Sequence, residues 1–391
     1  MPLRASRARP IILYVVTEDW YFLQHRVPMA RAALQAGYAV HVATRVNKDG
    51  RAIEGLGFEL HPLNWRRGSL NPVEVFGILV QLRRLYDAVK PDIIHHVALQ
   101  PVVIGSLASI GMPFAQLNSF FGLGWAFASR QPMARMVEAA LKLLLPRLTN
   151  RPHTIATVEN SDDKAVLSAI GLQPDRIFIL PGSGVDIHRL TPLAEPEGPI
   201  TAAFVGRLLV NKGIRTLVAA YDLLSNRGVQ ARLLIAGEAD PANPTSIPMQ
   251  EIEGWRTRSG IVVMGHVADI ANVWKLSHFS VLPSRGGEGL PMSLLEAAAC
   301  GRPLVATDVP GCREIARPGI NALLVPADDP SALADAISRM ARDGELRRRF
   351  GQASRRIVEA EYSSEIVGRE VLALYDRLSG RQPETLPDNQ S

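Results

Sequence analysis

The segment Arg285-Gly-Gly-Glu-Gly-Leu-Pro-Met-Ser-Leu-Leu-Glu-Ala-Ala-Ala-Cys-Gly301 joins a glycine-rich loop to a helix. Pro291 suits a first helical position and Gly301 is typical of a helix end, so the pattern predicts a helix over residues 293–300. Glu288 then lies in the loop and Glu296 lies in the helix. Because the glycines let a ligand approach main-chain N–H groups and a helix N-terminus favours negative charge, the segment indicates a site for a phosphorylated ligand, with one acid toward each of its ends.

The same segment also has a simpler interpretation. Glycine-rich loops before helices are common, and acids near a helix start often only complement the helix dipole. The segment alone leaves both interpretations open.

The residues around this loop resemble glycosyltransferase family 4. The family's signature is a glutamate, seven residues and a second glutamate, which Glu288 and Glu296 match. The flanks Val281-Leu-Pro-Ser284 and Gly301-Arg-Pro-Leu-Val-Ala-Thr-Asp-Val-Pro-Gly-Cys-Arg-Glu-Ile315 are similar to the family's usual ones. The resemblance implies an α/β protein of the GT-B fold, with two doubly wound, Rossmann-like parallel-sheet domains facing across a cleft. It also implies a retaining transferase that uses sugar nucleotides.

Length and composition indicate two domains. The 391 residues exceed the usual size of one hydrophobic core, and 47% apolar residues suffice for two. Residues 1–190 carry 21 Lys and Arg against 14 Asp and Glu, a net charge of +7, whereas residues 191–391 carry 22 against 24. The basic first half favours an anionic partner, with membrane lipid, nucleic acid and anionic substrate as candidates, although a solvated basic face explains it equally well.

The cysteines and the N-terminal residues indicate a reducing cytosol. Cys300 and Cys312 are too few for a disulfide framework and lack metal-ligand spacing with the histidines. The apolar residues 11–16 are too short for a signal peptide and suit a buried strand. Residues 97–129 are uncharged, but prolines and glycines interrupt them. They therefore predict a buried helix (102–110), a strand (113–117) and a glycine-rich loop better than a membrane span.

Short apolar runs alternate with amphipathic stretches in both halves, which is typical of parallel sheets covered by helices. The predicted helices of the first half include 26–37 and 72–89, and its predicted strands are 11–16, 39–44, 93–95, 113–117, 154–157 and 177–180. The predicted strands of the second half are 200–206, 231–237, 261–264, 279–283, 303–307 and 322–325.

Proline and glycine residues over 181–199 predict a hinge. We place an N-terminal acceptor-side domain at 1–190 and a C-terminal nucleotide-sugar donor domain at 191–363. The resemblance implies that the last helix, about 364–378, crosses back to the first domain. Residues 381–391 predict a disordered tail.

A second motif, Gly206-Arg-Leu-Leu-Val-Asn-Lys-Gly213, follows the first strand of the second half. Ligands bind at the carboxyl ends of strands in open α/β sheets. Arg207 offers a planar fork and Lys212 a mobile point charge, which suits two phosphates and the charge that builds on a leaving diphosphate. Such a pair is ordinary on a surface, but beside Glu288 and Glu296 it matches the diphosphate-binding pair of family 4.

The resemblance implies roles for further residues. Glu288 would contact sugar hydroxyls near the phosphate and Glu296 the ribose hydroxyls. Further contacts to the nucleotide sugar are expected at Gly206, Val267, Gly287, Gly289 and Leu290. No Asp-x-Asp metal motif is present, so we expect neither a metal nor another cofactor.

His95 and His96 end a predicted strand. Family members often carry a histidine where Val97 stands, which leaves open whether His95 or His96 touches the sugar. We assign His96 to the site, while a core or surface histidine is an equally good interpretation. Ala239 stands where the family often has a second close glycine, so a contact there stays open.

The acceptor is expected to bind the first domain. Residues 17–26 follow the first strand at the same sheet edge. Their acids and aromatic side chains suit a sugar acceptor, but aromatic side chains beside a first strand also commonly pack in the core. Residues 133–145 predict an amphipathic helix whose neighbouring arginines favour an anionic membrane surface, unless the helix docks on its own domain.

Three segments of the first half are similar to bacterial transferases that extend polyprenyl-diphosphate-linked sugars. They are the residues from Glu18-Asp-Trp20 to Arg26, His95-His-Val-Ala-Leu-Gln-Pro101, and Phe121-Gly-Leu-Gly124. We therefore expect a polyprenyl-diphosphate-linked acceptor, a peripheral location on the inner face of the cytoplasmic membrane, and no nucleic-acid partner.

The leading prediction is a metal-independent retaining glycosyltransferase for bacterial surface polysaccharide, with a UDP-sugar such as a UDP-N-acetylhexosamine as donor. A sugar-nucleotide epimerase or hydrolase of the same fold and a non-catalytic sugar-nucleotide-binding protein remain alternatives. A dinucleotide oxidoreductase is disfavoured because no Gly-x-Gly-x-x-Gly follows residues 11–16.

Overall fold

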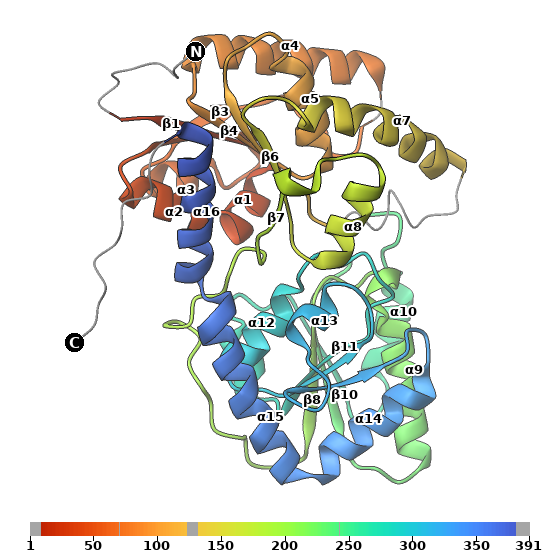
Figure 1. Cartoon of the computed structure of the whole chain (residues 1–391). Coiled ribbons are helices and arrows are strands. Elements are labelled where there is room, and N and C mark those ends of the chain that lie inside the picture. Colours follow the sequence, from red (N-terminus) through yellow and green to blue (C-terminus); the bar gives the residue numbers. More distant parts are fainter. Residues whose placement is uncertain (1–8, 70, 123–131, 242, 381–391) are drawn as a thin grey trace, which may run out of the picture. The chain divides into compact units, whose positions relative to one another are not determined.

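The computed structural model describes residues 9–69, 71–122, 132–241 and 243–380 (Figure 1). The chain forms two compact units: unit 1 comprises the residues up to Ser183 and those from Ser364 onward, and unit 2 comprises Gly184–Ser363. The boundary precedes the predicted one because residues 184–190 belong to unit 2, where the Val185 N–H donates to the Tyr362 carbonyl at 2.9 Å. The predicted tail, 381–391, lies outside the described residues.

Unit 1 is built on a sheet of seven parallel strands in the order β3-β2-β1-β4-β5-β6-β7. The sequence did not predict β3, because Glu59-Leu-His-Pro62 has no continuous apolar run. The strands are β1 (Ile11–Glu18), β2 (Ala39–Arg45), β3 (Glu59–Pro62), β4 (Ile93–Val97), β5 (Ala115–Ser119), β6 (Thr154–Val158) and β7 (Ile177–Ile179).

Helices cover both faces of this sheet. Along β1, Tyr14 packs with α2 and α16, whereas the next residue, Val15, packs with α4 and α5, because successive side chains of a strand point to opposite faces. The elements are α1 (Asp19–His25), α2 (Val27–Gln35), α3 (Gly50–Gly55), α4 (Pro72–Val89), α5 (Leu99–Ala108), α7 (Pro132–Thr149), α8 (Ser161–Ala169), the 3-10 turn η1 (Pro174–Arg176) and α16 (Ser364–Ser379).

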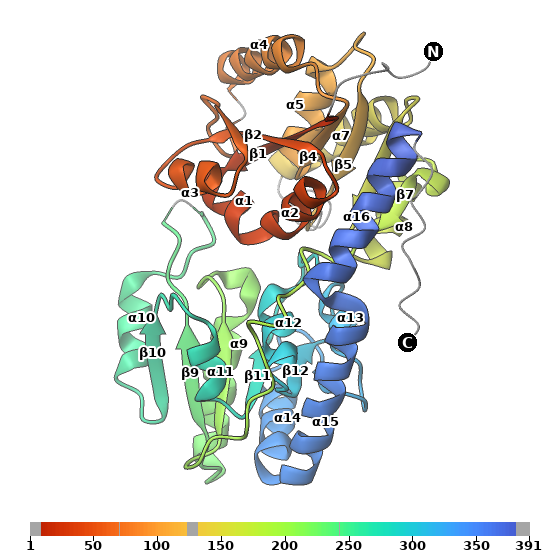
Figure 2. The same ribbon diagram turned by 90° about the vertical axis from the view of Figure 1, so that its left-hand side faces the viewer.

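The last helix, α16, packs in unit 1 beside α2 (Figure 2). The hydroxyl groups of Tyr14 and Tyr375 lie 2.7 Å apart in the core, and the Tyr38 hydroxyl donates to Asp376 Oδ1 at 3.2 Å. A Cβ added at Gly368 would lie 3.0 Å from the Cβ of Ala32, so glycine allows the close approach of the two helices.

Unit 2 is built on six parallel strands in the order β10-β9-β8-β11-β12-β13. The strands are β8 (Thr201–Val205), β9 (Arg232–Ala236), β10 (Ile261–Gly265), β11 (Phe279–Leu282), β12 (Leu304–Thr307) and β13 (Ala322–Val325). The helices and turns are η2 (Val210–Lys212), α9 (Ile214–Asn226), α10 (Met249–Arg256), α11 (Ala271–Lys275), α12 (Met292–Ala299), α13 (Cys312–Ile315), α14 (Pro330–Arg342), α15 (Gly344–Ile357) and the π-helical turn η3 (Val358–Tyr362).

Each sheet has one point at which the strand order reverses. In unit 2, β8 lies between β9 and β11; in unit 1, β1 lies between β2 and β4. Chain connections leave such a pair of strands in opposite directions, so the space beyond their carboxyl ends is open to a ligand. In unit 2 the loops that follow β8 and β11 carry Lys212 and Glu288.

The uncharged segment 97–129 contains α5 and β5, as a helix and a strand were expected there. The part of its predicted loop from residue 123 onward lies outside the described residues. Across the part of the chain that the structure describes, we find no helix with the length and apolar character needed to cross a membrane.

Candidate functional site

The Lys212 and Glu288 side chains meet at the strand-order reversal of unit 2. Lys212 Nζ lies 2.8 Å from Glu288 Oε1 and 2.7 Å from Oε2, so the ammonium bridges both carboxylate oxygens. Glu288 is nearly buried at 9% exposure, and the Lys212 side chain retains 20%. The structure therefore joins the two sequence motifs in one charged pair.

Ser284, which follows β11, fixes the Glu288 carboxylate and is itself held by Thr307 of β12. Ser284 Oγ donates to Glu288 Oε1 at 2.8 Å, and Thr307 Oγ1 donates to the Ser284 carbonyl at 2.5 Å. The Arg285 N–H donates to the Asn211 carbonyl at 2.8 Å, which ties the loop after β11 to the loop after β8. The carboxylate is therefore held before any ligand arrives.

The close approach of these two loops depends on Gly213. Its φ is +70°, and an added Cβ would lie 1.7 Å from the Pro283 carbonyl oxygen. No other residue fits this position without moving one of the loops.

The second acid, Glu296, lies on α12, which begins at Met292 with Pro291 as its N-cap, close to the predicted helix. Burial raises the pKa of Glu296 to about 7, and the Arg189 guanidinium opposes the shift. Within the described parts of the chain, the Glu296 carboxylate has no hydrogen-bonding partner. The carboxylate is half-buried and able to accept a hydrogen bond.

Arg207 lies at the same sheet edge but has a different partner. Its Nη1 donates to Asp240 Oδ2 at 2.7 Å, and the side chain is 44% exposed. The preceding residue, Gly206, packs its carbonyl against Gly237, where an added Cβ would lie only 1.9 Å from it. The structure thus brings Lys212 to Glu288 and leaves Arg207 exposed, with one of its five N–H donors used by Asp240.

The other predicted contacts also belong to loops at this edge. Val267 follows β10, where the His266 N–H donates to Glu238 Oε1 at 3.3 Å. Gly287, Gly289 and Leu290 follow β11 and precede α12; Gly287 is exposed, whereas Leu290 is buried.

The structure contradicts the assignment of His96 to the site. His96 is fully buried, with Nδ1 2.8 Å from Asn118 Oδ1 and Nε2 3.0 Å from the Tyr86 hydroxyl. Burial lowers its pKa to about 4, although the hydrogen bond to Asn118 opposes the shift. An added Cβ at Gly105 would lie 2.3 Å from the ring, so His96 fills a core space on a central strand rather than facing a ligand.

His95 is equally enclosed. Its Nδ1 lies 2.7 Å from the Tyr375 hydroxyl and its Nε2 lies 2.7 Å from Ser119 Oγ. Both histidines are therefore core residues in this structure, which is one of the interpretations that the sequence left open.

Asp19, directly after β1, has a role that the sequence did not reveal. Residues 19–25 form helix α1, and Asp19 is fully buried. Burial alone would raise the pKa of Asp19, but hydrogen bonds from the main-chain N–H groups of Asp49 and Asn47 and from the Asn47 side chain lower it overall. Asp19 therefore holds the loop after β2, while Trp20 stays half-exposed at the sheet edge.

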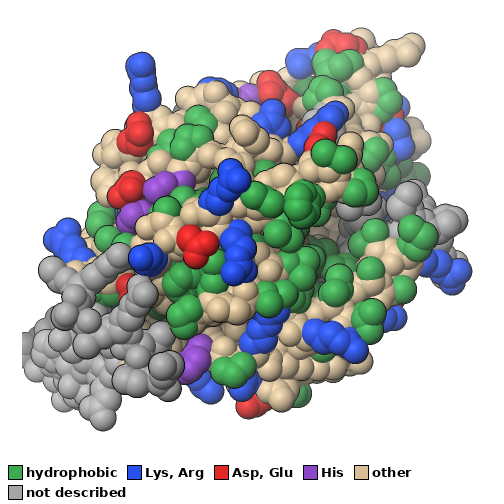
Figure 3. All heavy atoms as spheres, turned by 90° about the horizontal axis from the view of Figure 1, so that it is seen from above, with side chains coloured by type: hydrophobic (Ala, Val, Ile, Leu, Met, Phe, Trp, Pro, Cys, Tyr) green, Lys and Arg blue, Asp and Glu red, His purple; other side chains and the backbone are tan. Residues whose placement is uncertain are grey.

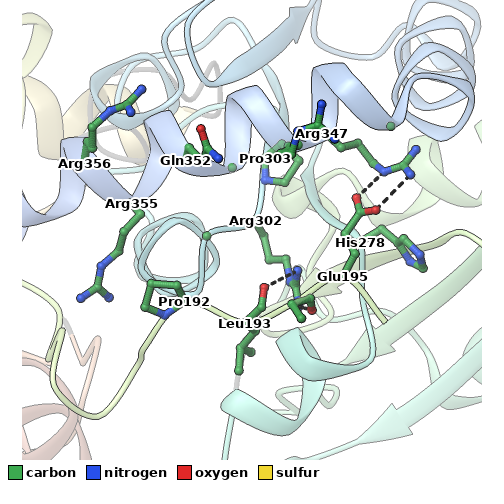
Figure 4. Close-up of a pocket in the computed structure, with 15 residues that line it drawn as sticks. Pro192, Leu193, Glu195, His278, Arg302, Pro303, Arg347, Gln352, Arg355 and Arg356 are labelled. Atoms are coloured by element: carbon green, nitrogen blue, oxygen red, sulfur yellow. Dashed lines mark hydrogen bonds and ion pairs between the residues drawn. The ribbon is translucent and has the colours of Figure 1, made fainter. Parts of the chain in front are cut away.

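A pocket of about 520 Å³ lies elsewhere in unit 2, between α15 and the segment that enters the unit (Figure 4). Arg302 donates to the Leu193 carbonyl at 3.1 Å and to the Ala194 carbonyl at 2.7 Å, and Arg347 pairs with Glu195. Arg302 precedes β12, so this pocket lies at the amino ends of the strands, away from Lys212 and Glu288. Its cations hold the entering segment.

Two family models match this chain. A family model described as "Glycosyl transferase 4-like" matches residues 11–150, and one described as "Glycosyl transferases group 1" matches residues 199–343. Together the two matches cover more than half of the chain.

Two curated relatives are similar over much of their length. The N,N'-diacetylbacillosaminyl-diphospho-undecaprenol alpha-1,3-N-acetylgalactosaminyltransferase of Campylobacter jejuni is 24% identical over 372 residues, covering 90% of this chain and 95% of the relative. The UDP-Gal:alpha-D-GlcNAc-diphosphoundecaprenol alpha-1,3-galactosyltransferase of Escherichia coli is 23% identical over 280 residues, covering 68% of this chain and 70% of the relative.

Among solved structures, the sucrose-phosphate synthase of Thermosynechococcus elongatus superposes with a TM-score of 0.79 at 21% identity, covering 95% of this chain and 100% of that one. The likeness shows a shared fold, the GT-B arrangement of two Rossmann-like parallel-sheet domains.

Proposed function

We propose that this chain, which belongs to the GT-B glycosyltransferases with a glycosyl transferase 4-like domain and a group 1 domain, is a retaining transferase. Its donor would be a nucleotide-diphosphate sugar, and its acceptor would be linked to a polyprenyl diphosphate. The Lys212–Glu288 pair at the strand-order reversal of unit 2 is the observation that carries the proposal.

The pair suits the reacting end of a nucleotide sugar. An ammonium has three N–H donors, so Lys212 keeps its contact with Glu288 and offers another donor to a phosphate oxygen. Glu288 Oε2 accepts from Lys212 and retains a lone pair for a sugar hydroxyl. One pair of side chains thereby sets the distance between the diphosphate and the sugar.

Arg207 and Glu296 complete the donor site in this proposal. Arg207 is exposed and uses one N–H on Asp240, so its remaining donors are available to the second phosphate. Glu296 accepts hydrogen bonds from the ribose hydroxyls, which favour its ionised form and offset the effect of burial.

In the transfer step, the bond from the anomeric carbon to the diphosphate oxygen breaks and a bond to the acceptor oxygen forms on the same face. The acceptor hydroxyl proton passes to the departing diphosphate oxygen, so no separate protein base is needed. The cations of Lys212 and Arg207 stabilise the charge on the leaving diphosphate, a role in which one preorganised donor contributes about 10²- to 10³-fold in rate. We propose that no metal ion takes part.

The names of two relatives support the choice of substrates. The Escherichia coli relative is named for UDP-galactose, and both curated relatives are named for a diphosphate-linked undecaprenol sugar. We propose a UDP-sugar donor and an acceptor of the same lipid-linked class for this chain, in the synthesis of a bacterial surface polysaccharide.

The lipid-linked acceptor leads to a proposed membrane surface on unit 1. Met136 and Leu143 are exposed on α7, at 68% and 57%, beside the exposed Lys142. In the same helix Leu141 and Leu145 are buried, so part of α7 docks on its own unit, as one of the two interpretations predicted. Figure 3, drawn from the side of α4, shows further hydrophobic side chains among Lys and Arg. Apolar side chains beside cations suit an anionic membrane surface.

A transfer assay tests the reaction. Purified protein is incubated with a panel of UDP- and GDP-sugars and a polyprenyl-diphosphate-linked monosaccharide, with excess EDTA in one arm. We expect a UDP-sugar-dependent disaccharide, insensitive to EDTA, whose NMR coupling shows the anomeric configuration of the donor. An inverted product contradicts retention. Free sugar or an altered sugar nucleotide without acceptor indicates a hydrolase or an epimerase, and binding without turnover indicates a non-catalytic protein.

Flotation with liposomes tests the membrane surface. We expect salt-sensitive binding to vesicles with anionic lipid, weakened by Met136→Glu together with Leu143→Glu. Binding that both changes leave untouched would exclude α7 from the membrane contact.

A further inference from the structure

Three possible metal ligands share one face at the edge of the unit 1 sheet. β3 is the edge strand and pairs in parallel with β2, so that His41 stands opposite Glu59 and Ala43 opposite His61. Residues two positions apart in a strand point to the same face, so Glu59 and His61 lie on one side together with His41.

The side chains converge closely. His41 Nδ1 lies 2.9 Å from His61 Nε2, and the two rings are nearly parallel, at 11°. Glu59 Oε1 lies 3.6 Å from His61 Nε2, and Glu59 Oε2 lies 3.5 Å from His41 Nε2. The ligand atoms of all three residues lie within 4.8 Å of one another.

This set has the chemistry of a transition-metal site. Imidazole nitrogens with a carboxylate oxygen suit Zn²⁺, and three protein ligands with a water are a common zinc arrangement. Zinc–nitrogen bonds of about 2.0–2.1 Å in tetrahedral geometry put two ligand nitrogens roughly 3.3 Å apart. The present separation of 2.9 Å needs to open only by a few tenths of an ångström.

We propose that His41, Glu59 and His61 bind one zinc-class divalent ion that links the edge strand β3 to β2. The His41 and His61 side chains are 10% and 19% exposed, whereas Glu59 is 64% exposed, so the ion enters from the Glu59 side. The site belongs to unit 1, whereas Lys212 and Glu288 belong to unit 2, so we assign the ion no part in binding the donor. Among the described residues no other His, Cys, Asp and Glu group meets the same geometric condition.

Calorimetric titration of tag-free, EDTA-stripped full-length protein with ZnCl₂ at pH 7.5 tests the proposal. Neutral imidazoles coordinate metal ions, so the titration is run above the pKa of about 6.5 that is usual for histidine. We expect one Zn²⁺ per chain, slower amide exchange in β3, and an absorption spectrum of tetrahedral coordination when Co²⁺ replaces Zn²⁺.

Matched variants decide whether these residues are the ligands. His61→Asn and His41→Asn should each weaken binding on the order of 100-fold, and Glu59→Gln about 10-fold or more. His153→Asn is the control, because His153 is exposed elsewhere and its positive φ of 56° suits asparagine. Circular dichroism checks that each variant is folded. Absence of Zn²⁺ binding, or affinity unchanged in the Glu59→Gln and His61→Asn variants, overturns the proposal.

Discussion

Lys212 Nζ lies 2.7 Å from Glu288 Oε2, although the two residues are 76 positions apart in the sequence. The contact exists because β8 and β11 are neighbours in the sheet and Gly213 lets their loops touch. The cation that we propose for the diphosphate and the acid that we propose for the sugar are thereby held together, and this arrangement predicts how variants behave.

Removing either member of the pair should slow transfer. Lys212→Ala and Glu288→Gln should each lower kcat by about 10²- to 10³-fold at saturating donor, because each removes a preorganised contact. The double variant should lose little more than either single variant, since the two groups act as a unit. Arg227→Ala, which opens the exposed pair of Arg227 with Asp335, is the control and should retain wild-type kcat. Near-normal transfer by the Lys212 and Glu288 variants would place the donor elsewhere.

Donor binding should depend on pH through Glu296. Burial raises its pKa to about 7 in the free protein, so below pH 7 the neutral form cannot accept ribose hydrogen bonds as strongly. The Kd for nucleotide should therefore rise as the pH falls from 8 to 6, and Glu296→Gln should flatten that dependence. Calorimetric titration across this range measures both; a parallel pH profile in the variant would contradict the assignment.

The same group makes a prediction for the free protein. The folded-state pKa of Glu296 lies above the usual value of 4.5, so the folded state holds a proton between about pH 4.5 and 7 that the unfolded state releases. The stability that protonated Glu296 contributes is present at low pH and is lost as the pH rises through 7. Without ligand, Glu296→Gln should raise Tm at pH 8 more than at pH 5, as measured by calorimetry.

Gly213→Ala should damage both stability and the site. Its φ is positive and the new Cβ would meet the Pro283 carbonyl oxygen at 1.7 Å, so the loops must separate. Gly228→Ala is the matched control, because its φ of +68° is similar but no atom lies within 4 Å of the added Cβ. We expect Gly228→Ala to cost about 1–2 kcal/mol in urea unfolding and to keep its activity. Gly213→Ala should cost more and lose nucleotide binding; equal losses in the two variants would indicate backbone strain alone.

His96 should act on stability and not on chemistry. Burial lowers its pKa to about 4, below the usual 6.5, so the unfolded state takes up a proton first as the pH falls. The stability that neutral His96 contributes is present above pH 6.5 and is lost toward pH 4. His96→Asn should lower the urea midpoint at pH 7.5, reduce its decline toward pH 5, and leave the pH profile of transfer by the folded protein unchanged. A shift in the pH profile of kcat in the His96→Asn variant would instead indicate that His96 takes part in the reaction.

Much of the fold was predictable because buried parallel strands have continuous apolar sequences, such as residues 11–16 and 303–307. Edge strand β3 was not, because Glu59-Leu-His-Pro62 is half-exposed and polar, and its pairing with β2 is the reason it is extended. Helix α1 was missed because its residues, acids and aromatics after a strand, suit a loop equally well.

The candidate site was predictable as motifs but not as contacts. The spacing of Glu288 and Glu296 and the Arg207–Lys212 motif placed four side chains at one sheet edge. Sequence alone does not reveal that Lys212 pairs with Glu288 while Arg207 pairs with Asp240, because these contacts depend on loop conformation. His96 was misassigned because a strand-end histidine has the same sequence pattern whether it faces a ligand or the core.

The return of α16 to unit 1 has a consequence for synthesis on the ribosome. Tyr14 emerges early, but its hydroxyl partner in the core, Tyr375, is made 361 positions later. Gly184–Ser363 form one uninterrupted stretch, so unit 2 has all its strands before α16 is translated. Because domains fold as units during translation, unit 2 can fold first while an apolar face of the unit 1 sheet stays uncovered. A chain that stops at Ser363 would thus release a finished second unit attached to an aggregation-prone first one.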